Sequence, residues 1–114
     1  MIPAGAVLLS DRAAAALMAL ETDSAPGSLA IARRARALKP ILLVDCLHGE
    51  VVRKSLIPKR LRAAYGLENL YVEDLRAFWR LLYTIVNRSG ERVIVVLEIV
   101  SHKECSRWFP GRRG

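Results

Sequence analysis

Four charged or ionisable side chains stand near the C-terminal end of the sequence, inside or just after two apolar segments. They are Arg80, Glu98, His102 and Lys103. Arginine suits a phosphate because its planar fork grips two oxygens at once. Histidine is the residue type whose unperturbed pKa allows acid or base catalysis near neutral pH. The set therefore indicates either a site for an anionic ligand or a group of charges that pair with one another.

A predicted β-hairpin positions these residues. Two segments have high β propensity: 78–86 and 92–101. The residues between them predict a three-residue turn that pairs Asn87 with Glu91. Counted back two by two from that pair, Arg80 falls opposite Glu98. One face of the hairpin is then purely apolar and consists of Trp79, Leu81, Tyr83, Ile85, Val93, Val95, Leu97 and Ile99.

The opposite face of the hairpin is mixed. It carries Phe78, Arg80, Leu82, Thr84, Arg92, Ile94, Val96, Glu98 and Val100. In one interpretation, Arg80 and Glu98 form a cross-strand ion pair, worth about 0.2–1 kcal/mol, on a solvated surface. In the other, the face is a binding site or docking surface, because side chains such as Leu82 and Val96 are poor choices for exposure to water. The pattern leaves both open.

Two predicted N-terminal helices cover the apolar face. A helical run begins after Ser10, a good N-cap, and ends before Pro26. A second helix runs from Ser28 towards His48, with Pro40 kinking or interrupting it. The remaining expected strands are 7–9 and 69–75. Together the elements predict an α+β domain, with an N-terminal helical hairpin packed on one face of a small antiparallel sheet of three to four strands.

Composition narrows the class of protein. The chain has 114 residues, 53% of them hydrophobic, and reads as a single domain, 1–114, with short flexible tails at both ends. Its longest apolar runs, 93–97 and 41–44, are far below the roughly 20 residues that span a bilayer. The N-terminus lacks the features of a secretory signal, so we expect a cytoplasmic protein with reduced cysteines.

The charge of the chain is strongly positive. Eighteen Lys and Arg residues against eleven Asp and Glu residues give a net charge of +7. A charge of this sign favours polyanions or an acidic protein partner. One basic cluster, on the second predicted helix, consists of Arg33, Arg34, Arg36 and Lys39, and another lies in the segment 51–66. Each is either a solvated surface or a contact for RNA or a partner.

A competing arrangement is a zinc site made of two pairs, Cys46 with His48 and His102 with Cys105. The residue types suit zinc, but a single intervening residue in the first pair is shorter than the usual spacing. A buried thiol at Cys46 and an exposed one at Cys105 are the simpler interpretation, and we expect neither a metal nor a cofactor. The sequence has no Gly-rich phosphate loop and no Ser-His-Asp order.

The order of strand, helical hairpin, basic loop and antiparallel strands resembles the RelE/ParE superfamily of type II toxins, closest to its archaeal RelE-like branch. The likeness runs from about Val7 to Phe109. Its most specific part is the Trp-Arg-Leu-Leu-Tyr strand at 79–83, followed by a hairpin and by the basic end Ser-His-Lys-Glu at 101–104. The resemblance implies an mRNA interferase, a metal-independent endoribonuclease that acts in the ribosomal A site and is neutralised by an antitoxin.

Carried over position by position, the resemblance gives Arg80 the role of phosphate clamp and makes Lys103 the basic residue at the end of the last strand. His102 then serves as acid or base, and Glu98 acts as the base or orients Arg80. Further residues that would hold the RNA backbone, or else form a solvated surface, are Lys54, Lys59, Arg60, Arg62 and Arg107. The expected partners are mRNA, the ribosome and a cognate acidic antitoxin, whose segment would cover Leu82 and Val96. The chain would be a monomer when free.

Two departures from the family pattern support an alternative. Many RNA-cleaving members carry lysines where this sequence has Val72, Glu73 and Asp74, and a tyrosine near the position of Cys105, Trp108 or Phe109. The alternative is a non-catalytic relative, either a ParE-like gyrase inhibitor or an inactive protein that still binds an antitoxin.

Overall fold

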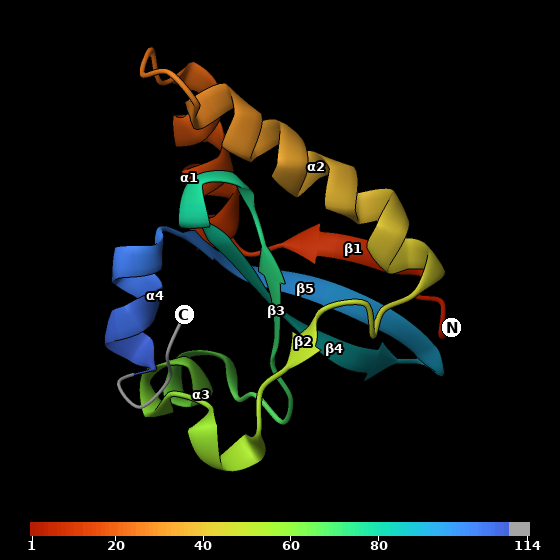
Figure 1. Ribbon diagram of the computed structural model, residues 1–114. Helices are drawn as coiled ribbons and strands as arrows, with labels where there is room; N and C mark the ends of the chain where they lie inside the picture. The colour runs from red at the N-terminus through yellow and green to blue at the C-terminus, as the bar shows by residue number, and fades with distance from the viewer. Residues whose placement is uncertain (110–114) are drawn as a thin grey trace.

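The structure is a computed structural model that describes residues 1–109. Its centre is one five-stranded sheet with the order β1-β5-β4-β3-β2 (Figure 1). The strands are β1 (Ala6–Leu9), β2 (Glu50–Val51), β3 (Tyr71–Asp74), β4 (Arg80–Arg88) and β5 (Glu91–Val100). The helices are α1 (Asp11–Thr22), α2 (Ser28–Val44), α3 (Lys59–Tyr65) and α4 (His102–Trp108), with single 3-10 turns η1 (Lys54–Leu56) and η2 (Arg76–Phe78).

The predicted α+β class is confirmed, but the sheet is larger and less regular than expected. It has five strands instead of three to four, and β1 runs parallel to β5, whereas the other neighbours are antiparallel. The direction of β1 is not set by a tight turn, because the whole helical hairpin separates it from the rest of the sheet. Strand β2 has two residues, too few for a period to be visible in the sequence.

The helical hairpin forms for the reasons that the sequence indicated. The Ser10 hydroxyl caps α1 by accepting a hydrogen bond from the Ala13 amide at 3.0 Å. Helix α2 begins at Ser28 and continues through Pro40 to Val44, so the proline does not interrupt it. Side chains from both helices pack on one face of the sheet, where they form the first core with residues of β4 and β5.

The N-terminal residues are not a free tail. The Ile2 carbonyl accepts from the Cys46 amide at 2.7 Å, and the Ala4 amide donates to Leu43 at 3.0 Å. The Asp45 carboxylate accepts from the Ile2 amide, which lowers its pKa. The expected C-terminal tail lies outside the described residues. Within residues 1–109, no helix combines the length and the apolar composition that a bilayer crossing needs.

The hairpin of β4 and β5 forms as predicted, but its register differs by up to two residues. Its turn has two central residues, Ser89 and Gly90, and pairs Arg88 with Glu91. A β-bulge then inserts one more residue into β5, opposite the step from Leu82 to Tyr83. In consequence Arg80 faces Val100 and Leu82 faces Glu98. The predicted pairing of Arg80 with Glu98 is therefore wrong.

The shift also changes the faces of β5. Ile94, Val96 and Ile99 lie in the first core, whereas Leu97 and Val100 lie on the opposite side of the sheet. From the turn to Val96, β5 is shifted by one residue from the predicted register, and this exchanges its two faces. The bulge adds a second residue and restores the predicted faces near the C-terminal end of β5. The predicted apolar face was right for β4 but wrong for most of β5.

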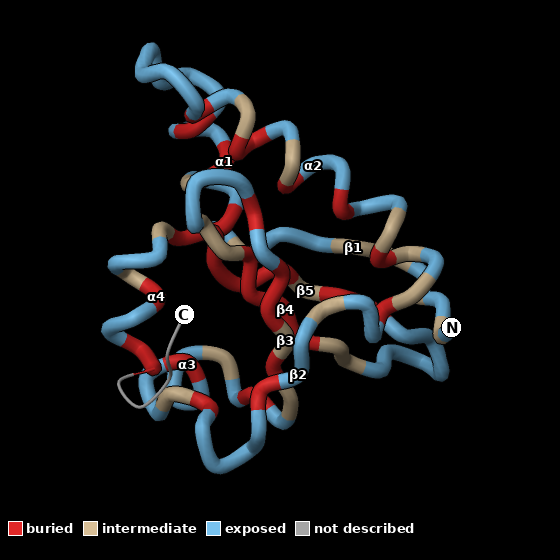
Figure 2. Tube along the Cα trace, in the orientation of Figure 1, coloured by how far each residue is buried: buried red, intermediate tan, exposed pale blue. Residues whose placement is uncertain are grey.

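The opposite side of the sheet is covered by the chain itself. Helices α3 and α4 pack there and bury a second core. That core consists of Val52, Ile57, Leu61, Leu67, Leu70, Val72, Leu82, Leu97, Val100, Cys105, Trp108 and Phe109. In Figure 2 the middle strands run as buried segments between exposed helix surfaces. Leu82 and Val96, the predicted contacts of the antitoxin, are buried in different cores. In this conformation neither side chain is accessible to a partner.

Candidate functional site

Arg80 lies at one end of the sheet, where β4 begins. It pairs with Asp74 at the end of β3 and with Val100 at the end of β5. Its Nε is 3.1 Å from the Asp74 carboxylate, and only 13% of its side chain is exposed, against 81% for Asp74. The guanidinium is thus held beneath the surface, with an exposed carboxylate beside it.

His102 and Lys103 lie at the same end but not on the last strand. They are the first two residues of α4, which the Ser101 hydroxyl caps by accepting from the Glu104 amide at 3.3 Å. The pattern Ser-x-x-Glu at 101–104 is the sequence signal of such a cap, and it could have located this helix. Val100 pairs with Arg80, and His102 follows Val100 by two residues. The register therefore brings Arg80, His102 and Lys103 to the same end of the sheet.

A strained turn meets His102 at this end. The turn η2 connects β3 to β4, and its residues Ala77 and Phe78 have φ angles of 55° and 62°. Left-handed backbone costs a residue with a side chain about 1–2 kcal/mol. The Phe78 ring lies 6.3 Å from the His102 ring between centroids, tilted by 59°. Sequence analysis missed this turn, because Ala and Phe are not the residues that tight turns prefer.

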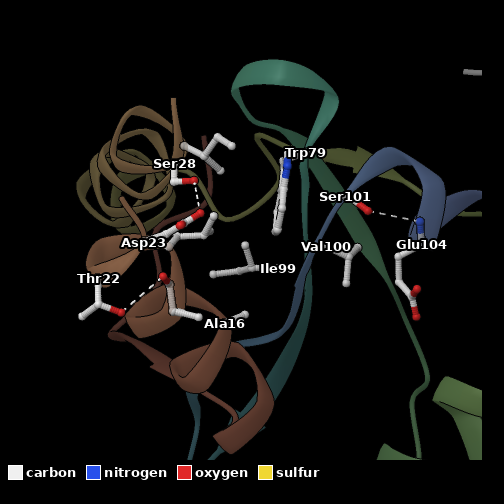
Figure 3. Close-up of a pocket in the computed structure, with 12 residues that line it drawn as sticks. Ala16, Thr22, Asp23, Ser28, Trp79, Ile99, Val100, Ser101 and Glu104 are labelled. Atoms are coloured by element: carbon white, nitrogen blue, oxygen red, sulfur yellow. Dashed lines mark hydrogen bonds between the residues drawn. The ribbon is translucent and has the colours of Figure 1, made fainter. Parts of the chain in front are cut away.

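An apolar pocket of about 640 Å³ opens beside the turn, between the α1–α2 connection and the start of α4 (Figure 3). Leu20, Ile31 and Ile99 give it an apolar lining, and Trp79 hangs from the turn towards Ile99. Polar groups stand at its edges. One is Asp23, whose pKa is lowered because its carboxylate accepts a 2.7 Å hydrogen bond from Ser28.

Glu98 belongs to a different environment. The bulge in β5 turns it towards α1 and α3, where Arg12 donates to both its oxygens at 3.2 and 2.9 Å and the Tyr65 hydroxyl donates at 3.1 Å. Hydrogen bonding to Glu98 raises the pKa of Arg12, and burial raises the pKa of Tyr65. Only 6% of the Glu98 side chain is exposed. It therefore joins α1, β5 and α3 and does not face Arg80.

The predicted RNA-backbone residues gather at the other end of α4. Lys59, Arg60 and Arg62 are on α3, and the Arg62 guanidinium donates to the Lys54 carbonyl at 2.6 Å. Arg60 lies over the Trp108 ring, 5.6 Å from its centroid. Arg107 is 3.5 Å from Glu104 on α4. Because α4 has seven residues, about 10 Å of helix separates these cations from His102 and Lys103.

The zinc arrangement does not assemble. Cys46 lies in the first core and Cys105 in the second, so the sheet separates the two predicted pairs. Cys105 was expected to be exposed, but α4 turns it inward. Among residues 1–109, no three His, Cys, Asp or Glu side chains come together.

A histidine–carboxylate pair was missed from the sequence. The His48 Nδ1 is 2.6 Å from the Glu73 carboxylate, whose side chain is 8% exposed. The sequence of β3 does not alternate between buried apolar and exposed polar residues, because Val72 and Glu73 are both buried although they point in opposite directions. A buried Glu73 could therefore not be recognised from the sequence. Nearby, the Tyr83 hydroxyl donates to the Cys46 carbonyl and accepts from the Gly49 amide, at 2.8 and 3.0 Å. These bonds fix the loop that carries His48.

Comparisons of the chain with protein-family models, with curated proteins and with solved structures find no match. The functional argument therefore depends on the residues and on their arrangement.

Proposed function

We propose that the protein is a RelE-like type II toxin, a ribosome-associated mRNA endoribonuclease that works in the cytoplasm without a metal and is neutralised by an acidic antitoxin. The observation that carries the proposal is the meeting of Arg80, His102 and Lys103 at one end of the sheet. Two separate stretches of sequence supply a phosphate-binding fork, an imidazole and an ammonium group there. The order of elements is also the one on which the family resemblance depends.

The reaction is the attack of a ribose 2′-oxygen on the adjacent phosphorus. A bond forms between these two atoms and the bond to the 5′-oxygen breaks, which leaves a 2′,3′-cyclic phosphate and a 5′-hydroxyl. One group must accept the proton of the attacking hydroxyl, one must donate a proton to the leaving oxygen, and cations must stabilise the crowded phosphate. His102 is the group at this end that suits proton transfer.

The cations have unequal access to a phosphate. Lys103 is exposed, whereas Arg80 is held by Asp74 and mostly covered. Arg80 therefore has to exchange the Asp74 carboxylate for the phosphate when RNA binds. Glu98 stays with Arg12 and Tyr65, so the proposal assigns proton transfer to His102 and gives Glu98 a positioning role. The cations of α3 provide a second contact for the RNA backbone or for acidic groups of the antitoxin.

The non-catalytic alternative is favoured by one specific observation. Both Arg80 and Glu98 already have partners of opposite charge in this conformation, as expected when charged residues stabilise a fold. A gyrase inhibitor or an inactive antitoxin-binding relative needs no released arginine.

Induction of the chain alone in cells separates the two functions. The endoribonuclease should stop growth and cut messages inside codons in translating extracts, and Arg80→Ala should relieve both effects. Arg88→Ala is the matched control, since Arg88 is an exposed arginine at the opposite end of the same strand. Arg88→Ala should unfold at a temperature near that of the wild type, whereas Arg80→Ala should fold but unfold at a lower temperature, because Arg80 is mostly covered and pairs with Asp74. Growth arrest with intact mRNA would support the gyrase inhibitor instead.

A further inference from the structure

Phe78 has an exposure that the proposed reaction does not explain. Of the phenylalanine, tyrosine and tryptophan side chains in residues 1–109, it alone is exposed, with 77% of its surface open to solvent. Figure 2 shows the connection between β3 and β4, which carries it, as an exposed loop near the α1 label. An open phenyl ring gains nothing from the hydrophobic effect in the isolated protein.

The backbone holds this ring in place. Phe78 and Ala77 are both in the left-handed region, and the turn is closed by a 3.1 Å hydrogen bond from the Trp79 amide to the Arg76 carbonyl. Trp79 lines the apolar pocket (Figure 3), whereas the neighbouring Phe78 is exposed. Strained residues of this kind are concentrated at binding and catalytic sites, where the strain fixes a side chain in advance.

The neighbours of Phe78 fit a nucleotide. The His102 ring lies against it, 6.3 Å away between centroids, so two aromatic rings border one open surface. Arg76, two residues before Phe78, and Lys103, directly after His102, are both exposed and supply positive charge near the two rings. Of the nearby carboxylates, Glu104 pairs with Arg107, and Asp74 pairs with Arg80 in the absence of RNA.

We propose that Phe78 and His102 form a stacking platform for one unpaired base of an RNA strand, with Arg76 and Lys103 at the flanking phosphates. The inference rests on the proposed function in taking RNA as the ligand, but it does not depend on cleavage. Aromatic rings bind the flat face that every base has, so the platform tolerates any base but requires a single strand. Its role is to seat the nucleotide beside the phosphate that Arg80 and Lys103 meet.

The test measures binding of a fluorescent single-stranded oligonucleotide whose sugars are all 2′-O-methylated. This probe lacks the attacking hydroxyl, so it reports binding alone. Phe78→Ala should weaken binding roughly 5- to 150-fold, the range that loss of one base–aromatic stack produces. Phe78→Trp should keep the affinity. Val51→Ala, which trims an exposed apolar residue on the edge strand β2, should leave it unchanged.

Abasic oligonucleotides locate the base. One abasic position should weaken binding to the wild type by the same factor, and should have no further effect on Phe78→Ala. The platform is excluded if the wild type does not bind the probe, if Phe78→Ala binds as tightly as the wild type, or if duplex RNA binds equally well. It is also excluded if Phe78→Ala weakens only the complex with an acidic antitoxin, because Phe78 is then a protein-binding anchor.

The outcome distinguishes this inference from the proposed function. If binding depends on Phe78 but the wild type cuts no RNA, the platform stands and the endoribonuclease fails. If RNA is cut inside codons with equal efficiency by the wild type and by Phe78→Ala, the endoribonuclease stands and the platform fails.

Discussion

Two turns close the ends of strand β4, and they share a backbone conformation but not a composition. Both central residues have positive φ in each, 55° and 62° for Ala77 and Phe78, 52° and 82° for Ser89 and Gly90. At the second turn glycine takes the largest angle, and the Asn87 side chain accepts from its amide at 3.0 Å. That turn uses residues that suit hairpins, whereas the first places a bulky ring where glycine is preferred.

The difference separates a folding role from a binding role. The Ser89–Gly90 turn contributes to the register of the hairpin and carries none of the proposed site. The Ala77–Phe78 turn stores strain, and its exposed ring lies against His102. We infer that the end of the sheet near Phe78 is adapted to a ligand at some expense in stability.

The largest expected effect concerns the proposed site at the end of the sheet near Phe78. His102→Ala should lower the rate of RNA cleavage by roughly 10² to 10⁴, because a positioned acid or base contributes a factor of that size. Single-turnover cleavage measures it, and binding of the methylated oligonucleotide should weaken by a much smaller factor, because the Phe78 ring of the platform remains.

Arg92→Ala is the control for that variant, since Arg92 is exposed near the second turn. It should cut RNA at the wild-type rate. Equal rates for the wild type and His102→Ala would remove the histidine from the mechanism and would leave the two ends of the sheet functionally alike.

The second effect concerns the second turn. Gly90→Ala should lower the free energy of unfolding by about 1–2 kcal/mol, because a Cβ is strained at a φ of 82° although nothing lies within 4 Å of it. Urea denaturation measures this loss. RNA binding should not change. If Gly90→Ala proves neutral, the composition of this turn has no bearing on stability.

The smallest expected effect comes from a double substitution that gives the Ala77–Phe78 turn a composition like that of the Ser89–Gly90 turn. Replacing Ala77 by Asn and Phe78 by Gly should raise the free energy of unfolding by about 0.5–1 kcal/mol, since relief of strain exceeds the entropic cost of the new glycine. The same protein should lose the Phe78-dependent part of RNA binding. A double variant that is less stable than the wild type would show that the turn is not strained in the way proposed here. Thermal and urea unfolding both measure the change.

The N-terminal half was the more predictable part of the fold. Ser10 located the start of the first helix, and Pro26 located its end. Pro40 was less informative, because packing on the sheet keeps α2 continuous through it. Such signals act over a few residues, so they survive without knowledge of the partner elements.

The candidate site was only partly predictable. Arg80, His102 and Lys103 lie at the same end of the sheet, but the predicted register between β4 and β5 was wrong. The observed register differs from the predicted one by two residues at Arg80. The shorter turn accounts for one of these residues, and the β-bulge accounts for the other. Phe78 was placed on a strand, since nothing in an Ala-Phe pair signals a turn.

The sequence by itself determined the α+β class, the helical hairpin and the existence of the last hairpin, because caps, turn formers and apolar periods are local. Tertiary structure alone decided which charges meet. Arg12 reaches Glu98 across 86 positions and His48 reaches Glu73 across 25, and each partner is available only after the sheet has formed. It also decided that α3 and α4 cover the second face. The burial of apolar surface selects such an arrangement among many that local preferences leave nearly equal in free energy.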